Sequence, residues 1–288
     1  MAVSLPVRAW CGPVDPAVRA AAVAALEAGQ VVVLPELAFR PLAEEASLLS
    51  EDVAAGGKRK NLSYDPASGR VGSGVGQEAL LCGMVRRFSG DAEALLRGLL
   101  APYGAALLVA RCSFRPAEIA GRSYSPRHDD RRLHVDAFPT RPTHGDRILR
   151  LFTNVSPVGR EREWHVGEAF ETVAERLLPS LPSPSPARSR LYALLGLTKG
   201  VRSAYDEMML ALHDRMKLDP EYQGSAGFAR CTFPAGVTWV CFTDQVSHAA
   251  LSGHLALEQT FHLPVSAMVE PETSPLRVLE RLMGRVLV

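Results

Sequence analysis

Residues 131–155 read RRLHVDAFPTRPTHGDRILRLFTNV, and this stretch decides the predicted fold. Two short runs rich in aliphatic residues, 133–138 and 147–155, are separated by a loop that contains two prolines and a glycine. Short apolar runs with turns between them are typical of antiparallel sheets that pack face to face. Similar runs occur at 105–114 and again within 228–263. We therefore expect two blocks of strands that form halves of one double-sheet fold.

Helical patterns surround the two strand blocks. Asp15 and Pro16 are suited to the N-cap and first position of a helix that stops at Gly29, and a strand is expected at 31–37. The predicted helices cover residues 16–28, 41–50, 76–100 (as two helices that break near Ser89-Gly90), 166–178, 187–197, 202–217 and 274–287.

The expected organisation is a single domain over residues 1–288. Its parts are a mainly helical N-terminal part (1–103), a β core (104–265) with a helical insertion at about 166–218, and a C-terminal helix (266–288). The Pro- and Ser-rich residues 179–186 form a spacer inside the insertion, because proline fits neither a helix interior nor a central strand.

Composition predicts an ordinary globular protein. Apolar residues make up 47% of the chain, charged residues make up 22%, and the net charge is +1. A chain this close to neutral has no overall field that attracts nucleic acid, so we expect no nucleic-acid partner. Five cysteines without a CxxC pair favour a reducing compartment, and neither a leader-like N-terminus nor an apolar run of membrane-spanning length is visible. We therefore expect a cytoplasmic protein, whose oligomeric state is left open.

The pattern His-x-Asp, a candidate metal-binding pair, occurs three times, at 128–130, 134–136 and 144–146. The first copy lies in a polar run and the third straddles a glycine, so both are typical of solvated loops or turns. His134 and Asp136 instead lie between apolar residues. On a strand, residues two apart point to the same face, which would place this imidazole and carboxylate side by side. We therefore favour the second copy.

A 2-His-1-carboxylate site for non-haem iron needs one further histidine. The strand block at 237–263 is the natural donor, because a double sheet returns a distant strand to the side of the first pair. It offers His248, His254 and His262, and spacing alone leaves all three open.

Three segments together resemble the Kdo 3-hydroxylases: 131–155, CFTDQVSHAALSGHLALEQTFHLPV at 241–265, and KNLSYD at 60–65. These are Fe(II)- and 2-oxoglutarate-dependent dioxygenases of Gram-negative bacteria that hydroxylate carbon 3 of Kdo in the lipopolysaccharide inner core, giving Ko. The resemblance implies an α+β fold with a double-stranded β-helix (jelly-roll) core, flanking helices and a helical N-terminal part. It also implies His134, Asp136 and His248 as catalytic iron ligands, with 2-oxoglutarate and O2 as cosubstrates.

One position departs from the pattern of 2-oxoglutarate enzymes. Many of them place an arginine just after the distal histidine to bind the far carboxylate of the cosubstrate, whereas this chain has Gly253-His254 there. We expect the clamp to be Arg147 or Arg150, one of which should point into the β core, and we prefer Arg147. The alternative is that both arginines are surface charges.

The implied acceptor is Kdo-bearing lipid A, an anionic glycolipid, so loop residues with basic or hydrogen-bonding side chains are the candidate substrate ligands. These candidates are Lys60, Asn61, Tyr64, Arg127, Arg131 and Arg132. Ordinary solvated loops, and a core position for Tyr64, are the alternatives.

The acceptor also implies possible peripheral contact with the cytoplasmic face of the inner membrane. The amphipathic C-terminal helix is one candidate for that contact, but we favour its packing on the β core. Two rival functions are an oxygenase that acts on another small molecule or protein, and a non-enzymatic jelly roll that binds sugar or lipid.

Overall fold

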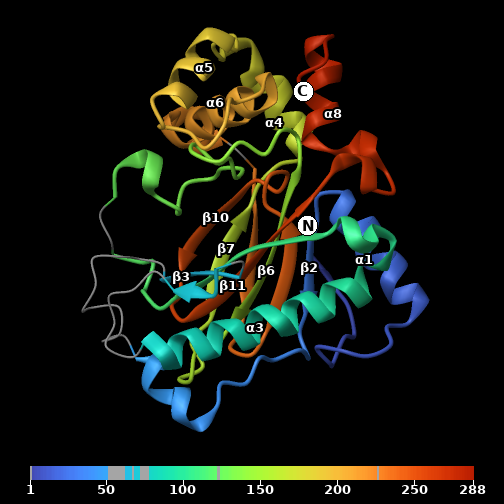
Figure 1. Cartoon of the computed structure of the whole chain (residues 1–288), viewed down its shortest axis with the longest axis vertical. Helices are drawn as coiled ribbons and strands as arrows, with labels where there is room; N and C mark the ends of the chain where they lie inside the picture. The colour runs from blue at the N-terminus through green and yellow to red at the C-terminus, as the bar shows by residue number, and fades with distance from the viewer. Residues whose placement is uncertain (1, 51–61, 67, 72–77, 122–123, 226) are drawn as a thin grey trace.

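The computed structural model describes residues 2–50, 62–66, 68–71, 78–121, 124–225 and 227–288 (Figure 1). The strands are β1 (Ala2–Ser4), β2 (Val31–Leu34), β3 (Leu62–Asp65), β4 (Arg70–Val71), β5 (Leu108–Arg115), β6 (Arg147–Asn154), β7 (Arg162–Val166), β8 (Ala229–Phe233), β9 (Thr238–Phe242), β10 (His248–Ser252) and β11 (Ala256–Leu263). The α-helices are α1 (Pro16–Glu27), α3 (Glu78–Leu99), α4 (Phe170–Leu177), α5 (Pro186–Leu194), α6 (Ala204–Leu218), α7 (Pro220–Ser225) and α8 (Pro275–Met283).

The strands form two sheets, as the alternation of short apolar runs predicts. The larger sheet has the order β1-β2-β9-β6-β11-β5-β3-β4, and its neighbours are antiparallel except for β1 and β2, which are parallel. The smaller sheet has the order β10-β7-β8 and is antiparallel. The fold is therefore mixed, with a large antiparallel sheet and helices around it.

Aromatic side chains fill part of the space between the two sheets. The ring centroid of Trp164 on β7 lies 5.1 Å from that of Phe152 on β6 and 5.6 Å from that of Trp239 on β9. Even-numbered residues of β6 therefore face the smaller sheet. Odd-numbered residues such as Leu149 and Leu151 belong to a separate apolar cluster with residues of α1 and α3. Figure 1 shows α3 running along that side of the larger sheet.

The first hundred residues contribute both helices and strands. Helix α1 begins and ends where its caps predict, because Asp15 accepts a hydrogen bond from the Ala17 amide (2.7 Å) and Gly29 adopts a left-handed φ of 70°. The predicted strand at 31–37 is the shorter β2, and the predicted helix at 41–50 is a 3-10 helix, Ala43–Leu49. Strands β1 to β4 join the larger sheet.

The predicted break near Ser89-Gly90 is wrong, because α3 is one continuous helix of 22 residues. Its buried residues recur at helical spacing on both sides of Gly90: Leu81, Met84, Val85, Phe88, Ser89, Ala92, Leu95, Leu96 and Leu99. A mid-helix glycine costs only about 1 kcal/mol relative to alanine. Packing of this continuous apolar stripe outweighs that cost.

The later helices lie together at one end of the β core (Figure 1). Helices α4, α5 and α6 correspond to the helices predicted at 166–178, 187–197 and 202–217. Helix α8 is capped by Gly284, which is left-handed with a φ of 64°. The apolar face of α8 is buried, as favoured from the sequence, and includes Leu276 and Leu279. None of the helices in the described part of the chain has the length and apolarity that a bilayer crossing requires.

Candidate metal centre

The strand expected at 133–138 is reduced to a single β-bridge, and that bridge joins two candidate ligands. The His134 amide donates to the His248 carbonyl (3.0 Å), and the His248 amide donates to the His134 carbonyl (2.8 Å). The Asp136 amide donates to the carbonyl of Thr243 (2.7 Å). Segments more than a hundred residues apart are thereby aligned, and ligand atoms of His134, Asp136 and His248 all lie within 4.8 Å of one another.

Hydrogen bonds fix which nitrogen each imidazole presents. Nδ1 of His134 lies 2.7 Å from the Arg132 carbonyl oxygen, and Nδ1 of His248 lies 2.8 Å from the Val246 carbonyl oxygen. A carbonyl only accepts, so each Nδ1 carries the proton and each Nε2 keeps a lone pair for a metal. Nε2 of His134 lies 3.8 Å from Oδ1 of Asp136. Two such nitrogens and a carboxylate fit a divalent iron ion.

The protonation states also suit metal binding. Burial lowers the pKa of His134 and of His248, so both imidazoles are neutral near pH 7. Burial, the largest single effect, would raise the pKa of Asp136, but Arg150, the two histidines and the Thr243 side chain together outweigh it, and the pKa lies well below its usual range. The site therefore combines two neutral nitrogen donors with one anionic oxygen donor.

Two further side chains hold the ligands in place. The indole of Trp164 stacks on the ring of His248 at 5.2 Å and 24°. The Gln223 side chain accepts from the Leu133 amide (3.0 Å) and donates to the Leu133 carbonyl (2.9 Å), which fixes the backbone next to His134. Such outer contacts orient metal ligands. Sequence analysis identified neither residue, because both act across distant segments.

Arg150 lies beside the candidate ligands. Its Nη1 is 3.1 Å from Oδ2 of Asp136 and 3.5 Å from Oε1 of Glu258, and its side chain is 13% exposed. Like Phe152, it is on the face of β6 that points toward the smaller sheet. This arginine is therefore largely buried, next to the metal centre.

Arg147 is on the other face of β6 and is fully buried. Its Nε donates to Oδ2 of Asp244 (2.8 Å), its Nη2 donates to Oε1 of Gln245 (2.7 Å), and its guanidinium lies 3.9 Å from the centroid of the Phe242 ring. These contacts fix the segment that leads to His248. Arg147 is thus committed to partners away from the ligands, although the sequence favoured it as the clamp.

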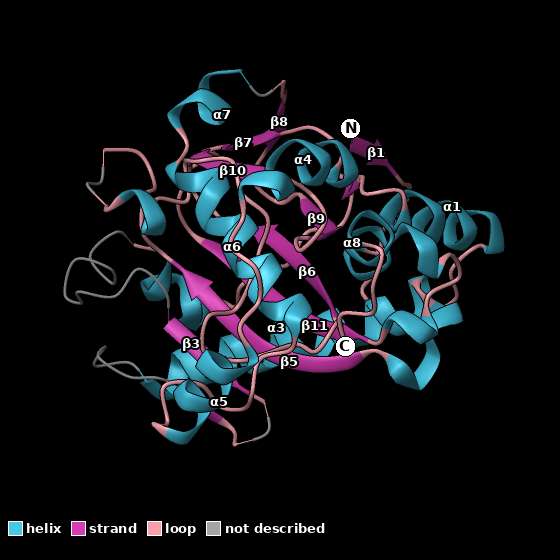
Figure 2. Cartoon of the chain, turned by 90° about the horizontal axis from the view of Figure 1, so that it is seen from above, coloured by secondary structure: helices cyan, strands magenta, loops and turns pink. Residues whose placement is uncertain are grey.

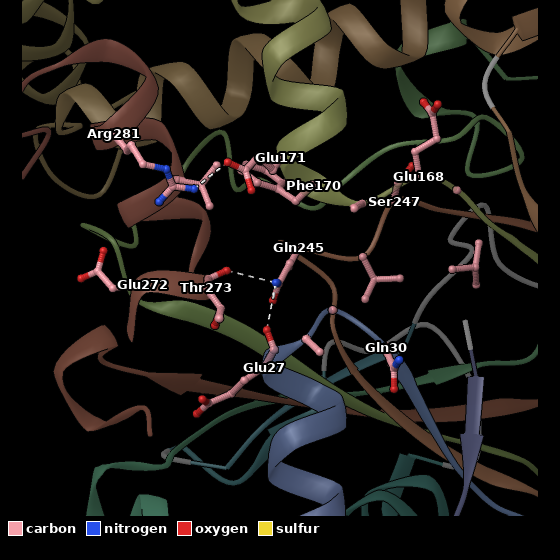
Figure 3. A pocket seen from close by; sticks show the side chains of 17 residues that line it. Glu27, Gln30, Glu168, Phe170, Glu171, Gln245, Ser247, Glu272, Thr273 and Arg281 are labelled. Atoms are coloured by element: carbon pink, nitrogen blue, oxygen red, sulfur yellow. Dashed lines mark hydrogen bonds and ion pairs between the residues drawn. The ribbon is translucent and has the colours of Figure 1, made fainter. Parts of the chain in front are cut away.

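Figure 3 shows a cavity of about 490 Å³ that lies between this segment, α1, α4 and α8. Nε2 of Gln245 donates there to the backbone carbonyls of Glu27 and Thr273, at 3.1 Å each. Gln245 therefore joins three elements and supports the chain just before His248.

Three charged residues that sequence analysis missed gather near Arg150. Arg115 on β5 contacts Glu258 on β11 (2.5 Å), and Arg162 on β7 is 4% exposed. Burial, followed by repulsion from Arg115, lowers the pKa of Arg162 to about 10. Among the described residues, Nε and Nη1 of Arg162 have no hydrogen-bond partner. The signal available in the sequence was the alternation in REWHV (162–166), which places Arg162 on the same face as the buried Trp164.

A groove of about 840 Å³ opens beside this charged cluster, and we call it the basic groove. Its lining includes Arg111, Arg115, Arg141, Arg150, His144 and His262, together with Glu258, Thr260 and the loop 138–143. Arg111 and Arg141 are exposed at its outer part, whereas Arg150 and Glu258 lie deep. The groove thus runs from a rim with exposed arginines to Arg150, which contacts the candidate ligand Asp136.

Of the substrate residues expected from the sequence, Tyr64, Arg127, Arg131 and Arg132 do not line the basic groove. Lys60 and Asn61 lie outside the described residues, and Tyr64 is 4% exposed in the core, the alternative left open above. Arg127 pairs with Asp214 (3.4 Å), Arg131 pairs with Asp129 (2.8 Å), and Arg132 donates to the Lys217 carbonyl.

The other histidines that the sequence singled out stay apart from the ligand set. His128 is exposed and bonds Ser125, and the His144 side chain is 57% exposed. His254 lies 3.8 Å from Glu118, and His262 lines the basic groove.

Comparisons with known proteins show which family the chain belongs to. The chain matches the family described as 3-deoxy-D-manno-oct-2-ulosonic acid (Kdo) hydroxylase over residues 10–286. It is 44% identical to the Kdo hydroxylase KdoO, a non-haem Fe(II) α-ketoglutarate-dependent dioxygenase, solved with α-ketoglutarate and Fe(III); the match covers 100% of this chain and 97% of that one, with a TM-score of 0.94. The cobalt(II) complex of KdoO matches with the same identity and coverage and a TM-score of 0.95. A search of curated proteins found no match. From its sequence and its structure together, the chain belongs to the Kdo hydroxylase family.

Proposed function

We propose that this protein is an Fe(II)- and 2-oxoglutarate-dependent dioxygenase that hydroxylates carbon 3 of Kdo in Kdo-bearing lipid A, giving Ko. The observation that carries the proposal is the convergence of His134, Asp136 and His248 within 4.8 Å, in the protonation states that a divalent metal requires. The relative KdoO, solved with α-ketoglutarate and Fe(III), supports it. We also assign the two packed sheets to a jelly-roll core.

Iron, when bound, supplies the oxygen chemistry that amino-acid side chains lack. His134, Asp136 and His248 would hold it, and three protein ligands leave positions for a cosubstrate and oxygen. Trp164 and Gln223 would keep the ligands in place. The space between the sheets would keep bulk water away from the reacting sugar carbon.

The charged cluster beside the ligands fits 2-oxoglutarate. Arg115, Arg150 and Arg162 carry three positive charges, whereas Glu258 and Asp136 carry two negative charges, so the cluster keeps one uncompensated positive charge. 2-Oxoglutarate is a dianion, and carboxylates pair well with guanidinium groups. Within the described part of the chain, Nε and Nη1 of Arg162 have no acceptor, so they offer two further donors to a carboxylate. We therefore assign the clamp to Arg150, with Arg115 and Arg162 as its neighbours, in place of Arg147.

The basic groove is the proposed path for the acceptor. Kdo carries a carboxylate and is attached to a phosphorylated lipid, so exposed Arg111 and Arg141 at the rim suit it electrostatically. His262 and Thr260 offer hydrogen-bonding groups deeper in the groove. We assign Arg127, Arg131 and Arg132 to positioning the loop before His134, because each already contacts a partner there.

Mass spectrometry of Kdo-containing lipid A tests the proposal directly. Incubation with enzyme, ferrous iron and 2-oxoglutarate should add the mass of one oxygen atom to the Kdo part of the lipid and form succinate. His134→Ala should abolish both products, because it removes an iron ligand, whereas His128→Ala should leave them unchanged. Lipid that is unmodified by the folded, iron-loaded enzyme would reject this function, and activity that survives in His134→Ala but not in His128→Ala would reject the site.

A further inference from the structure

Large apolar side chains are exposed on α5 and the turn that follows it. The exposed fractions are 51% for Leu191, 84% for Leu194, 61% for Leu195 and 57% for Leu197. We call residues 191–197 the leucine turn. Figure 1 shows α5 at the outer edge of the molecule, beyond α6. Four leucines this exposed within seven residues are uncommon on a monomer and are typical of a binding surface.

The leucine turn is held in its outward orientation by its own backbone and by polar anchors. Gly196 adopts a left-handed φ of 68°, and the Leu197 amide donates to the Tyr192 carbonyl (2.9 Å). On the inner side of α5, the buried Ser189 donates to Glu207 on α6, and Arg188 pairs with the same carboxylate (3.0 Å). The helix therefore buries polar groups and exposes leucines, the reverse of an ordinary surface helix.

Basic residues border the leucine turn. Arg190 and Lys199 are exposed, and Arg202 lies with its guanidinium 5.6 Å from the centroid of the Tyr192 ring. Glu207 on α6, the carboxylate that anchors α5, is buried and paired with Arg188, so it does not cancel these exposed positive charges. Leucines flanked by arginine and lysine are the pattern of a surface that lies on an anionic bilayer, because the leucines enter the acyl boundary while the cations contact the headgroups.

The leucine turn is joined to the rim of the basic groove. The Lys199 amide donates to the Thr140 carbonyl (2.9 Å), and Arg202 donates to the Pro139 carbonyl; Pro139 and Thr140 both line the groove. A bilayer in contact with the leucine turn would therefore lie next to the groove. A sugar that protrudes from a membrane lipid would meet the groove opening there.

We infer that the leucine turn docks this protein on an anionic membrane surface and presents the basic groove to a lipid-linked sugar. The part of the inference that concerns the sugar rests on the proposed function, whereas the docking does not. The C-terminal helix does not take this role, because the apolar face of α8 is buried in the core. A second copy of the chain is the competing occupant, and the experiment separates the two.

Sedimentation with vesicles that contain no Kdo lipid tests the docking independently of catalysis. The protein should bind vesicles of phosphatidylethanolamine and phosphatidylglycerol more tightly than vesicles of phosphatidylcholine alone. Leu194→Ser combined with Leu197→Ser should weaken binding roughly tenfold or more, because two apolar side chains no longer enter the bilayer. Val158→Ser is the matched control, since Val158 is 70% exposed in the turn between β6 and β7 and should not affect binding.

A second variant gives a signal that depends on insertion itself. In Leu194→Trp, the emission of the new tryptophan should shift to the blue when anionic vesicles are added, and brominated lipids should quench it. The tryptophan of Val158→Trp should show neither change. Vesicle binding that is absent in the native protein, or equal in the double serine variant, would overturn the inference. So would analytical ultracentrifugation that shows a native dimer and a monomeric serine variant, since the leucines would then join two copies.

The activity arm keeps this inference separate from the proposed function. With Kdo-lipid A in vesicles, the double serine variant should lose most of its turnover, yet it should oxidise a detergent-solubilised Kdo lipid at the native rate. Loss of oxygen insertion in both forms, with vesicle binding intact in the native protein, would reject the function and leave the docking standing. Equal native and variant rates on vesicles would reject the docking.

Discussion

At the scale of single residues, parity along β6 separates two arginines that are three positions apart. Arg150 shares a face with Phe152 and reaches Asp136, whereas Arg147 shares a face with Leu149 and reaches Asp244. The two residues are chemically identical, so their neighbours alone distinguish their roles. Arg150 lies beside the candidate metal ligands, whereas Arg147 supports the segment that leads to His248.

Substitution of each arginine should therefore affect a different measurement. Arg150→Gln should raise the apparent KM for 2-oxoglutarate by roughly tenfold or more, because the cosubstrate carboxylate loses its guanidinium partner. The Tm of the iron-loaded enzyme should change little, because Arg115 still pairs with Glu258 and the metal offsets the charge of Asp136. Arg147→Gln should lower the free energy of unfolding by about 3 kcal/mol, because Asp244 is left buried without its partner. Steady-state kinetics and thermal unfolding of both variants check this. A raised KM for the folded Arg147 variant alone would return the clamp to Arg147.

At the scale of elements, α3 shows how packing decides whether a helix continues. Its sequence contains Ser89-Gly90, which weakens the helix locally, yet the buried stripe from Leu81 to Leu99 carries it through. Gly90 is exposed, and a Cβ at this position would lie more than 4 Å from every other part of the described chain outside its own stretch of helix. The glycine therefore serves neither a turn nor a close contact.

Gly90→Ala should accordingly stabilise the protein. The gain should be about 1 kcal/mol, because alanine restricts the unfolded chain and is the better helix former. Denaturant unfolding of the variant, with its midpoint compared with that of the native protein, measures the effect. By contrast, Gly253→Ala should destabilise the protein. The φ of Gly253 is 108°, and the Cβ of an alanine there would lie 2.6 Å from Cγ of Arg162. A lower unfolding midpoint for Gly90→Ala would mean that the helix does break there.

At the scale of the whole molecule, the candidate metal ligands come from two distant segments that contacts within the protein already fix side by side. The backbones of His134 and His248 pair directly, Gln223 braces Leu133, and Gln245 braces the other segment against α1. Buried neutral imidazoles and the Asp136–Arg150 pair need no metal to offset a charge. The site is therefore preorganised by protein contacts.

Removal of the metal should leave the fold intact. With a chelator, the circular dichroism spectrum should be unchanged. The free energy of unfolding should fall only by the contribution of metal binding, which is about 2.7 kcal/mol if free iron had been present at a hundred times its Kd. Activity should return when ferrous iron is added back. Loss of the far-ultraviolet signal on chelation would show instead that the metal organises the β core.

The sequence by itself determined the local features of this protein. The caps of α1, the alternation along the strands and the choice of the second His-x-Asp copy depend on residues within a few positions of one another, and such interactions are encoded locally. The resemblance to a family added His248, which spacing left open between three histidines. The structure places His248 opposite His134 by backbone pairing.

Only the tertiary structure decided which charged side chains share one chamber. Arg115, Arg150 and Arg162 come from three strands, and their meeting beside Glu258 depends on register and on the packing of two sheets. The tertiary structure also decided that Arg147 pairs with Asp244, away from the candidate ligands, and that the leucine turn is exposed. The free energy of a buried charge, and of an exposed leucine, is set by what lies across from it. Neighbours in space, unlike neighbours in sequence, are fixed only when distant segments pack together.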